Sequence, residues 1–133
     1  MYDPLFEIPD RNARKWAMFC HLGGLVRITF FPFGAILVPF IIWLAKQDEH
    51  PYIDEQGREA VNYQFTMSVM SLAAWLAIAV LKWIPIIGIL RFPLYVVPPL
   101  IWIAAVGGAI YAAMRVNDGD DFHYPFSFNI CRR

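Results

Sequence analysis

Two long stretches without a charged side chain limit what this chain can fold into. They cover residues 60–81 and 92–114, and each is long enough to cross a hydrocarbon layer as an α-helix, which takes about 20 residues. Apolar residues make up 59% of the 133-residue chain and charged residues 17%, which is more apolar than an ordinary soluble domain. The sequence therefore predicts a single-domain, all-α integral membrane protein.

The charge pattern divides the chain into four expected helices. They cover approximately residues 14–31, 35–46, 54–83 and 92–115. We expect Asp54 to cap the third helix and Pro98-Pro99 to kink the fourth. The second helix is too short, at ~1.5 Å of rise per residue, to cross a hydrocarbon core of ~30 Å. The predicted fold is a four-helix bundle with a short N-terminal helical hairpin and two longer spanning helices.

Aromatic and polar residues alternate after the last helix. This period of two indicates a short extended segment with one apolar face, formed by Phe122, Tyr124, Phe126, Phe128 and Ile130. A lone strand cannot cross lipid, so we expect an interfacial tail that lies along the membrane or against the domain. An anchor is the simpler interpretation, although a strand that binds a partner has the same pattern.

A polar block at residues 48–64 leads directly into the first uncharged stretch. Glu55, Glu59, Asn62 and Thr66 follow at spacings of four, three and four, so they share one helix face. This stripe could form a groove for a partner peptide, a lipid head group or a cation. It could instead solvate the helix end and tie it to the Lys46 turn or to Arg58. The candidate partner or pathway residues are Asp54, Glu55, Arg58, Glu59, Asn62, Gln64 and Thr66, with His21 and Arg27 on the first helix.

The first helix contains two polar side chains within an apolar run. His21 has no neighbours at metal-ligand spacing, so a hydrogen bond to another helix is the expected role. Arg27 lies near the far end of its helix, where its side chain can extend to the interface. No P-loop, zinc-protease or nucleophile motif is present in the sequence. We therefore expect no enzyme activity, no cofactor and no metal.

Small residues recur every four positions in the last helix, in two ridges: Ala104, Gly108 and Ala112, and Ala105, Ala109 and Ala113. Such ridges allow helices to approach closely, and they could serve internal packing or oligomerisation. Trp75 and Trp102 lie in the middle of the uncharged stretches, where we expect them to pack inside the bundle.

Basic residues predict the orientation in the membrane. Eight of them fall on the side that holds both termini and the polar block, while Lys82 and Arg91 fall on the other. This bias places both termini in the cytoplasm, in a bacterial inner membrane. Because the formal net charge is zero, no nucleic-acid partner is expected. Membrane lipids, and either a membrane-protein partner or a second copy of the chain, are the expected partners.

Residues 15–64 resemble bacterial members of the Tic-twenty-like superfamily of small four-helix membrane proteins. The shared pattern reads W-A-x-x-x-H-L, then P-x-G, W-L-x-K-x-D, and finally P-[FY]-[VI]-D-x-Q-G-[KR]-E-A-[LV]-N-[FY]-Q. Here it falls on Trp16, Ala17, His21, Leu22, Pro32, Gly34, Trp43, Leu44, Lys46, Asp48, Pro51 and residues 54–64, and a later Y-P pair fits Tyr124-Pro125. Arg27 and the prolines of residues 82–99 depart from the pattern.

The resemblance implies a membrane location and leaves the activity open. Its relatives include a protein-import component of the chloroplast inner envelope and the MamF/MmsF-type proteins, which sit in the magnetosome membrane and influence crystal growth. A shared fold does not transfer function. Our first hypothesis is a non-enzymatic protein that scaffolds a larger membrane assembly through its cytoplasmic polar block. The alternative is a subunit of an oligomeric pathway for proteins or ions, lined by the polar stripe.

Overall fold

The computed structural model describes residues 9–28 and 34–131, and within those ranges the regular elements are all helices. The α-helices are α1 (Arg11–Leu22), α2 (Gly34–Lys46), α3 (Pro51–Leu81), α4 (Arg91–Leu94) and α5 (Val97–Asn117), and the 3₁₀-helices are η2 (Gly23–Ile28) and η3 (Ile86–Leu90). The prediction of an all-α fold with a short hairpin and two longer helices is confirmed.

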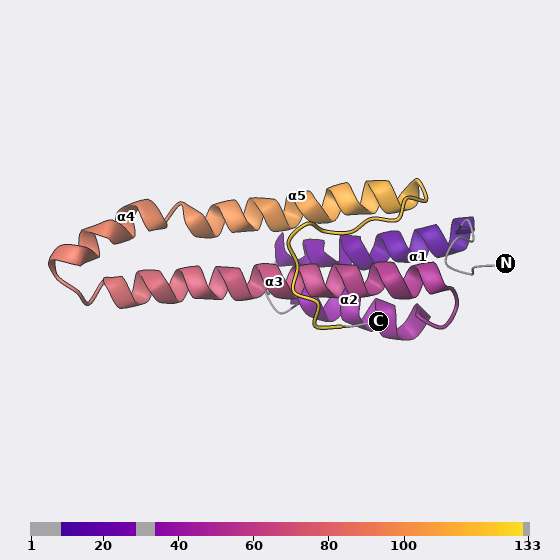
Figure 1. The fold of residues 1–133 in the computed structure, drawn as a ribbon, viewed down its shortest axis with the longest axis horizontal. Coiled ribbons are helices and arrows are strands. Elements are labelled where there is room, and N and C mark those ends of the chain that lie inside the picture. Colours follow the sequence, from indigo (N-terminus) through magenta and orange to yellow (C-terminus); the bar gives the residue numbers. More distant parts are fainter. Residues whose placement is uncertain (1–8, 29–33, 132–133) are drawn as a thin grey trace.

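The helices are arranged so that one end of the molecule is thicker than the other. Helix α3 runs antiparallel to α4 and α5, and α1 and α2 pack only beside the half where α3 begins and α5 ends (Figure 1). We call this half the four-helix end. The remaining part of α3 and α5, together with η3 and α4, forms a two-helix arm.

Small side chains let α1 and α5 approach closely at the four-helix end. Ala13 and Ala17 of α1 are at most 1% exposed, and α1 packs against both α5 and α3. On α5 the buried small residues are Ala105, Ala109, Ala112 and Ala113. Because these alanines lie inside the bundle, this part of the small-residue pattern serves internal packing; Ala104, by contrast, is exposed.

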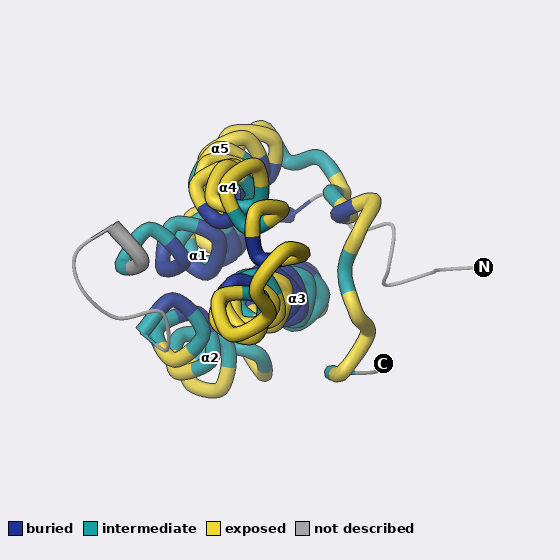
Figure 2. The backbone as a smooth tube through the Cα atoms, turned by 90° about the vertical axis from the view of Figure 1, so that its left-hand side faces the viewer, coloured by how far each residue is buried: buried dark blue, intermediate teal, exposed yellow. Residues whose placement is uncertain are grey.

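The outward faces of the arm are exposed (Figure 2), and they carry large apolar side chains. Leu72 and Val80 of α3 are each 60% exposed, and Ile86 of η3 is 92% exposed. Residues Pro51–Leu81 and Ile86–Asn117 are each long and apolar enough to cross a membrane, and their most apolar windows are only 22% and 11% buried. The core helix of a soluble protein would be mostly buried, so this exposure fits a hydrocarbon solvent.

The two central tryptophans contradict our expectation of packing inside the bundle. Trp75 is 52% exposed and Trp102 is 41% exposed, because both lie on the arm, where α1 and α2 do not reach. Trp75 contacts the ring of Tyr95 edge-on, with 6.5 Å between centroids. Periodicity identified the helices correctly but could not tell which of their faces have a protein neighbour.

Two helix boundaries also differ from the predictions, for local reasons. Helix α3 begins at Pro51, and His50 caps it by accepting the N–H of Tyr52 at Nδ1 over 3.0 Å. Proline fits the first helical position because it has no N–H to leave unbonded, so Asp54 is not the cap. The predicted fourth helix is broken at residues 95–96 instead of kinked at Pro98, since the ring of Pro98 would clash with the carbonyl four residues earlier.

The C-terminal tail, residues 118–131, leaves α5 and crosses α3 at the four-helix end (Figure 1). It is an irregular extended segment with no strand partner in the described chain. Its apolar side chains differ in burial, and the predicted interfacial anchoring stays a prediction. Tyr124 is 9% exposed, whereas Phe126 is 78% and Phe128 57% exposed.

Candidate functional site

The polar stripe of α3 lies beneath the C-terminal tail and holds the tail's backbone. The amide of Asn62 is the central contact, since its Oδ1 accepts the N–H groups of Ile130 at 3.2 Å and Cys131 at 2.9 Å. Its Nδ2 donates to the carbonyl of Cys131 at 3.4 Å. One buried side chain thus satisfies backbone groups that have no strand to pair with.

Two further stripe residues hold the tail on either side of Asn62. Thr66 Oγ1 accepts the N–H of Phe128 at 2.8 Å and donates to the carbonyl of Asn62 at 2.8 Å. Glu59 Oε2 accepts the N–H of Tyr124 at 3.2 Å. The stripe is therefore an internal attachment surface over most of its length.

A buried chain of hydrogen bonds joins α1, α3 and the tail. Burial, reinforced by the nearby Tyr63 and Glu59, raises the pKa of the Tyr124 phenol well above its ordinary value. Gln56 Oε1 can only accept, so His21 Nε2–H donates to it over 3.2 Å, which leaves His21 Nδ1 to accept from the Tyr124 hydroxyl over 2.9 Å. Gln56 Nε2 then donates to Asp121 Oδ1 over 3.1 Å.

Aromatic stacking fixes the tail at the same place. The rings of Tyr63 and Tyr124 are stacked, with 3.7 Å between centroids and an angle of 3° between planes. Phe122 meets Tyr124 edge-on at 4.9 Å and His21 edge-on at 6.2 Å. The role expected for His21, hydrogen bonding to a neighbouring helix, agrees with these contacts.

The start of α3 is attached to α2 through Trp43. Its Nε1–H donates to Asp54 Oδ1 over 2.8 Å, and Asp54 also forms an ion pair with Arg58 at 2.6 Å. The indole ring lies against Gly57, where an added Cβ would come within 2.5 Å of the ring. Only glycine permits this approach, which explains the Q-G pair of the motif.

The remaining candidates are less directly involved in the stripe. Gln64 is 2% exposed, and it lies against Gly24, where an added Cβ would meet the Gln64 amide at 2.1 Å. Lys46 pairs with Glu49 at 2.6 Å, so the expected tie between the stripe and Lys46 is absent from the contacts described. The side chain of Arg27 lies outside the described residues, and its predicted position stays a prediction.

A pocket remains open between α3 and the tail, with a volume of about 570 Å³. It is lined by Glu55, Arg58, Glu59, Asn62, His123, Asn129 and Cys131. Burial raises the pKa of the Cys131 thiol, although nearby Arg58 acts in the opposite direction. The pocket thus offers carboxylates, amides, an imidazole and a neutral thiol on the one part of the stripe that the tail leaves accessible.

Several residues that build this region were not among the sequence candidates. Gln56 and Trp43 were present in the resemblance motif, and Tyr124 in its Y-P pair, so the motif carried that signal. No sequence pattern pointed to Asp121 or His123, because they lie in the turn and tail, more than 60 positions from their partners on α3.

The helices and their burial define the class of this protein. It is a small all-helical membrane protein whose short hairpin packs on one half of two long apolar helices. The chain belongs to the MamF/MmsF family, the magnetosome magnetite crystal formation protein family, whose model matches residues 12–131. No curated protein and no solved structure is significantly similar to it.

Proposed function

We propose that this chain is a non-enzymatic membrane scaffold that takes part in magnetite crystal formation. The observation that carries the proposal is the two-helix arm, which exposes large apolar side chains and has no covering helix in the described chain. Membership of the family indicates that the process is magnetite crystal formation. The exposed apolar arm accounts for how the protein is held in the membrane. The wider Tic-twenty-like relationship remains a prediction from the motif.

The arm alone is too short to span the membrane. From Met67 to Leu81, α3 covers ~22 Å at ~1.5 Å per residue, against a hydrocarbon core of ~30 Å. The hydrocarbon layer therefore also includes the part of α2 where Leu37 and Ile41 are each 55% exposed, and the end of α1 beside it. The short hairpin accordingly enters the membrane without crossing it.

The distribution of basic residues supports a cytoplasmic four-helix end. Arg11, Lys46, Arg58 and Arg115 lie where α1 begins, α2 ends, α3 begins and α5 ends, which is one end of the molecule (Figure 1). Lys82 and Arg91 lie at the tip of the arm. Positively charged residues stay on the cytoplasmic side during insertion. This favours an orientation with both termini in the cytoplasm, as in a protein of the bacterial inner membrane.

The docking surface of the scaffold is smaller than the whole polar block. Gln56, Asn62, Gln64 and Thr66 are buried, so these four side chains are out of a partner's reach, whereas Glu55, Arg58 and Glu59 line the open pocket. We propose that a membrane-protein neighbour, or a second copy of the chain, docks there.

Site-specific crosslinking tests this proposal in living cells. A photo-reactive residue at Asn129, an exposed position on the pocket rim, is expected to capture one defined membrane protein. The same residue at Leu76, which is 56% exposed on the arm, is expected to capture lipid. If Asn129 captures only lipid, or if both positions capture the same random set of proteins, the scaffold proposal fails.

The pathway alternative makes a different prediction. The tail lies on Asn62 and Thr66, so a path along the stripe requires the tail to leave. If the stripe conducts, Glu59→Gln should change ion flux through liposomes while the gel-filtration profile and thermal stability of the protein stay the same, because glutamine removes the charge and keeps an oxygen for Tyr124 N–H. Equal flux in the wild type and the variant would reject conduction along this stripe.

A further inference from the structure

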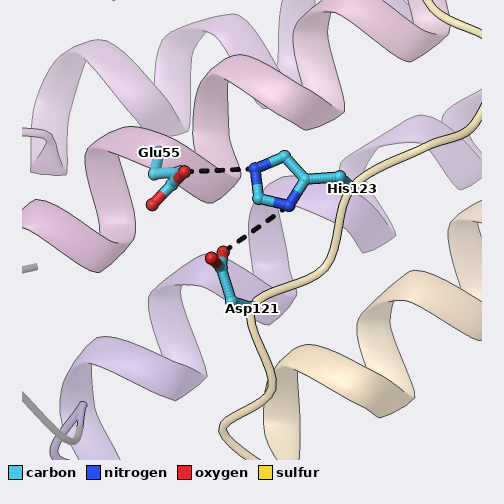
Figure 3. A group of neighbouring side chains, drawn as sticks. All are labelled: Glu55, Asp121 and His123. Carbon is cyan, nitrogen blue, oxygen red and sulfur yellow. Dashed lines mark hydrogen bonds and ion pairs between the residues drawn. The ribbon is translucent and has the colours of Figure 1, made fainter. Parts of the chain in front are cut away.

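Three potential metal ligands converge where the tail begins to cross α3 (Figure 3). Glu55 comes from α3, while Asp121 and His123 come from the tail, and their ligand atoms all lie within 4.8 Å of one another. His123 Nε2 is 3.1 Å from Glu55 Oε1, and His123 Nδ1 is 3.8 Å from Asp121 Oδ1. This set combines one imidazole with two carboxylates from segments that are distant in sequence.

Buried residues outside the set hold two of these ligands in place. Asp121 accepts a hydrogen bond at Oδ1 from Gln56 Nε2 over 3.1 Å, and Gln56 is fully buried. His123 directly precedes Tyr124, which is fixed by its stack on Tyr63. Outer hydrogen bonds of this kind orient ligands and tune metal sites, so the ligand positions are supported by the core and do not depend on surface side chains alone.

The site also has room for a coordinated ion and its waters. Glu55 and His123 both line the pocket of about 570 Å³, and Glu59 lies on the same wall. The side chains of His123 and Asp121 are 44% and 62% exposed, so they can close from the present spacing to bonding distances of about 2.0–2.2 Å. Three protein ligands leave the other coordination positions to water.

We propose that Glu55, Asp121 and His123 bind one divalent transition-metal cation, and that this ion fastens the C-terminal tail to α3. Imidazole selects against magnesium and calcium, while two carboxylates suit Fe²⁺, Mn²⁺ and Zn²⁺. The inference is independent of the scaffold proposal, because it concerns only contacts within this chain.

Titration with a single metal tests the site directly. The full chain, purified in detergent, is titrated with ZnCl₂ and separately with MnCl₂. Isothermal titration calorimetry measures the heat of binding, and EPR of Mn²⁺ reports manganese binding independently. We expect one ion per chain, with affinity lowered about tenfold or more in each of Glu55→Gln, Asp121→Asn and His123→Gln. Two matched controls, Glu49→Gln and Asp118→Asn, change carboxylates near the same segments and should bind as the wild type does.

Amide hydrogen exchange distinguishes a metal ion that fastens the tail to α3 from a simple ion pair of His123 with the two carboxylates. Addition of Zn²⁺ should slow exchange of the tail amides that bond to Thr66 and Asn62, those of Phe128, Ile130 and Cys131. The effect should vanish in His123→Gln. The absence of stoichiometric binding, equal loss of affinity in the controls, or binding without slower exchange in the tail would each overturn the proposal.

Discussion

Replacing Tyr124 with alanine should destabilise the four-helix end by about 3–5 kcal/mol, the usual cost of truncating a buried aromatic side chain. The variant loses the stack on Tyr63, which has 3.7 Å between ring centroids. It also leaves His21 Nδ1, in a side chain that is 1% exposed, without the phenol that donates to it. Thermal unfolding of the full chain in detergent, followed by circular dichroism, measures the loss.

Two control variants make the result for Tyr124 specific. Tyr124→Phe keeps the stacked ring and removes only the hydrogen bond to His21, so the expected cost is about 1–3 kcal/mol. Phe126→Ala, at a side chain that is 78% exposed, should change the melting temperature little. If Tyr124→Ala melted at the same temperature as Phe126→Ala, the tail would not be part of the folded core.

Alanine at two adjacent glycines of α5 should shift stability in opposite directions. At Gly108 an added Cβ would lie 2.2 Å from the hydroxyl of Tyr63 and 2.8 Å from its ring. The ring cannot turn away easily, because it stacks on Tyr124 and its hydroxyl donates to the Ala104 carbonyl over 2.6 Å. Overpacking of this kind costs about 1–3 kcal/mol, so Gly108→Ala should lower the melting temperature.

Gly107 provides the matched position, since no atom lies within 4 Å of a Cβ added there. Gly107→Ala should stabilise α5 by up to about 1 kcal/mol through helix propensity alone. In a Tyr63→Phe background, Gly108→Ala should lose part of its cost, because the nearest clashing atom is gone; a double-mutant cycle measures this coupling. Shifts of the same sign at both glycines would contradict the close α3–α5 contact.

The polar stripe shows how far residue spacing carries a prediction. Spacings of four, three and four placed Glu55, Glu59, Asn62 and Thr66 on one helix face, and the pocket and tail contacts confirm that they share it. The occupant of that face could not be predicted, since helical periodicity says which residues point together and nothing about what lies opposite. The start of α3 depended on which of two local N-caps forms. His50 caps the helix at Pro51, so the predicted cap at Asp54 does not form.

The sequence by itself determined that two long helices and a short hairpin form, because uncharged stretches of that length can satisfy their backbone in hydrocarbon only as helices. Only the tertiary structure decided that the tail covers Asn62 and that His123 reaches Glu55, which is 68 positions away in the chain. Those contacts depend on how α1, α3 and α5 pack around Tyr63 and Tyr124. Packing of that kind joins distant segments through shape and burial, and no local pattern of residues records it.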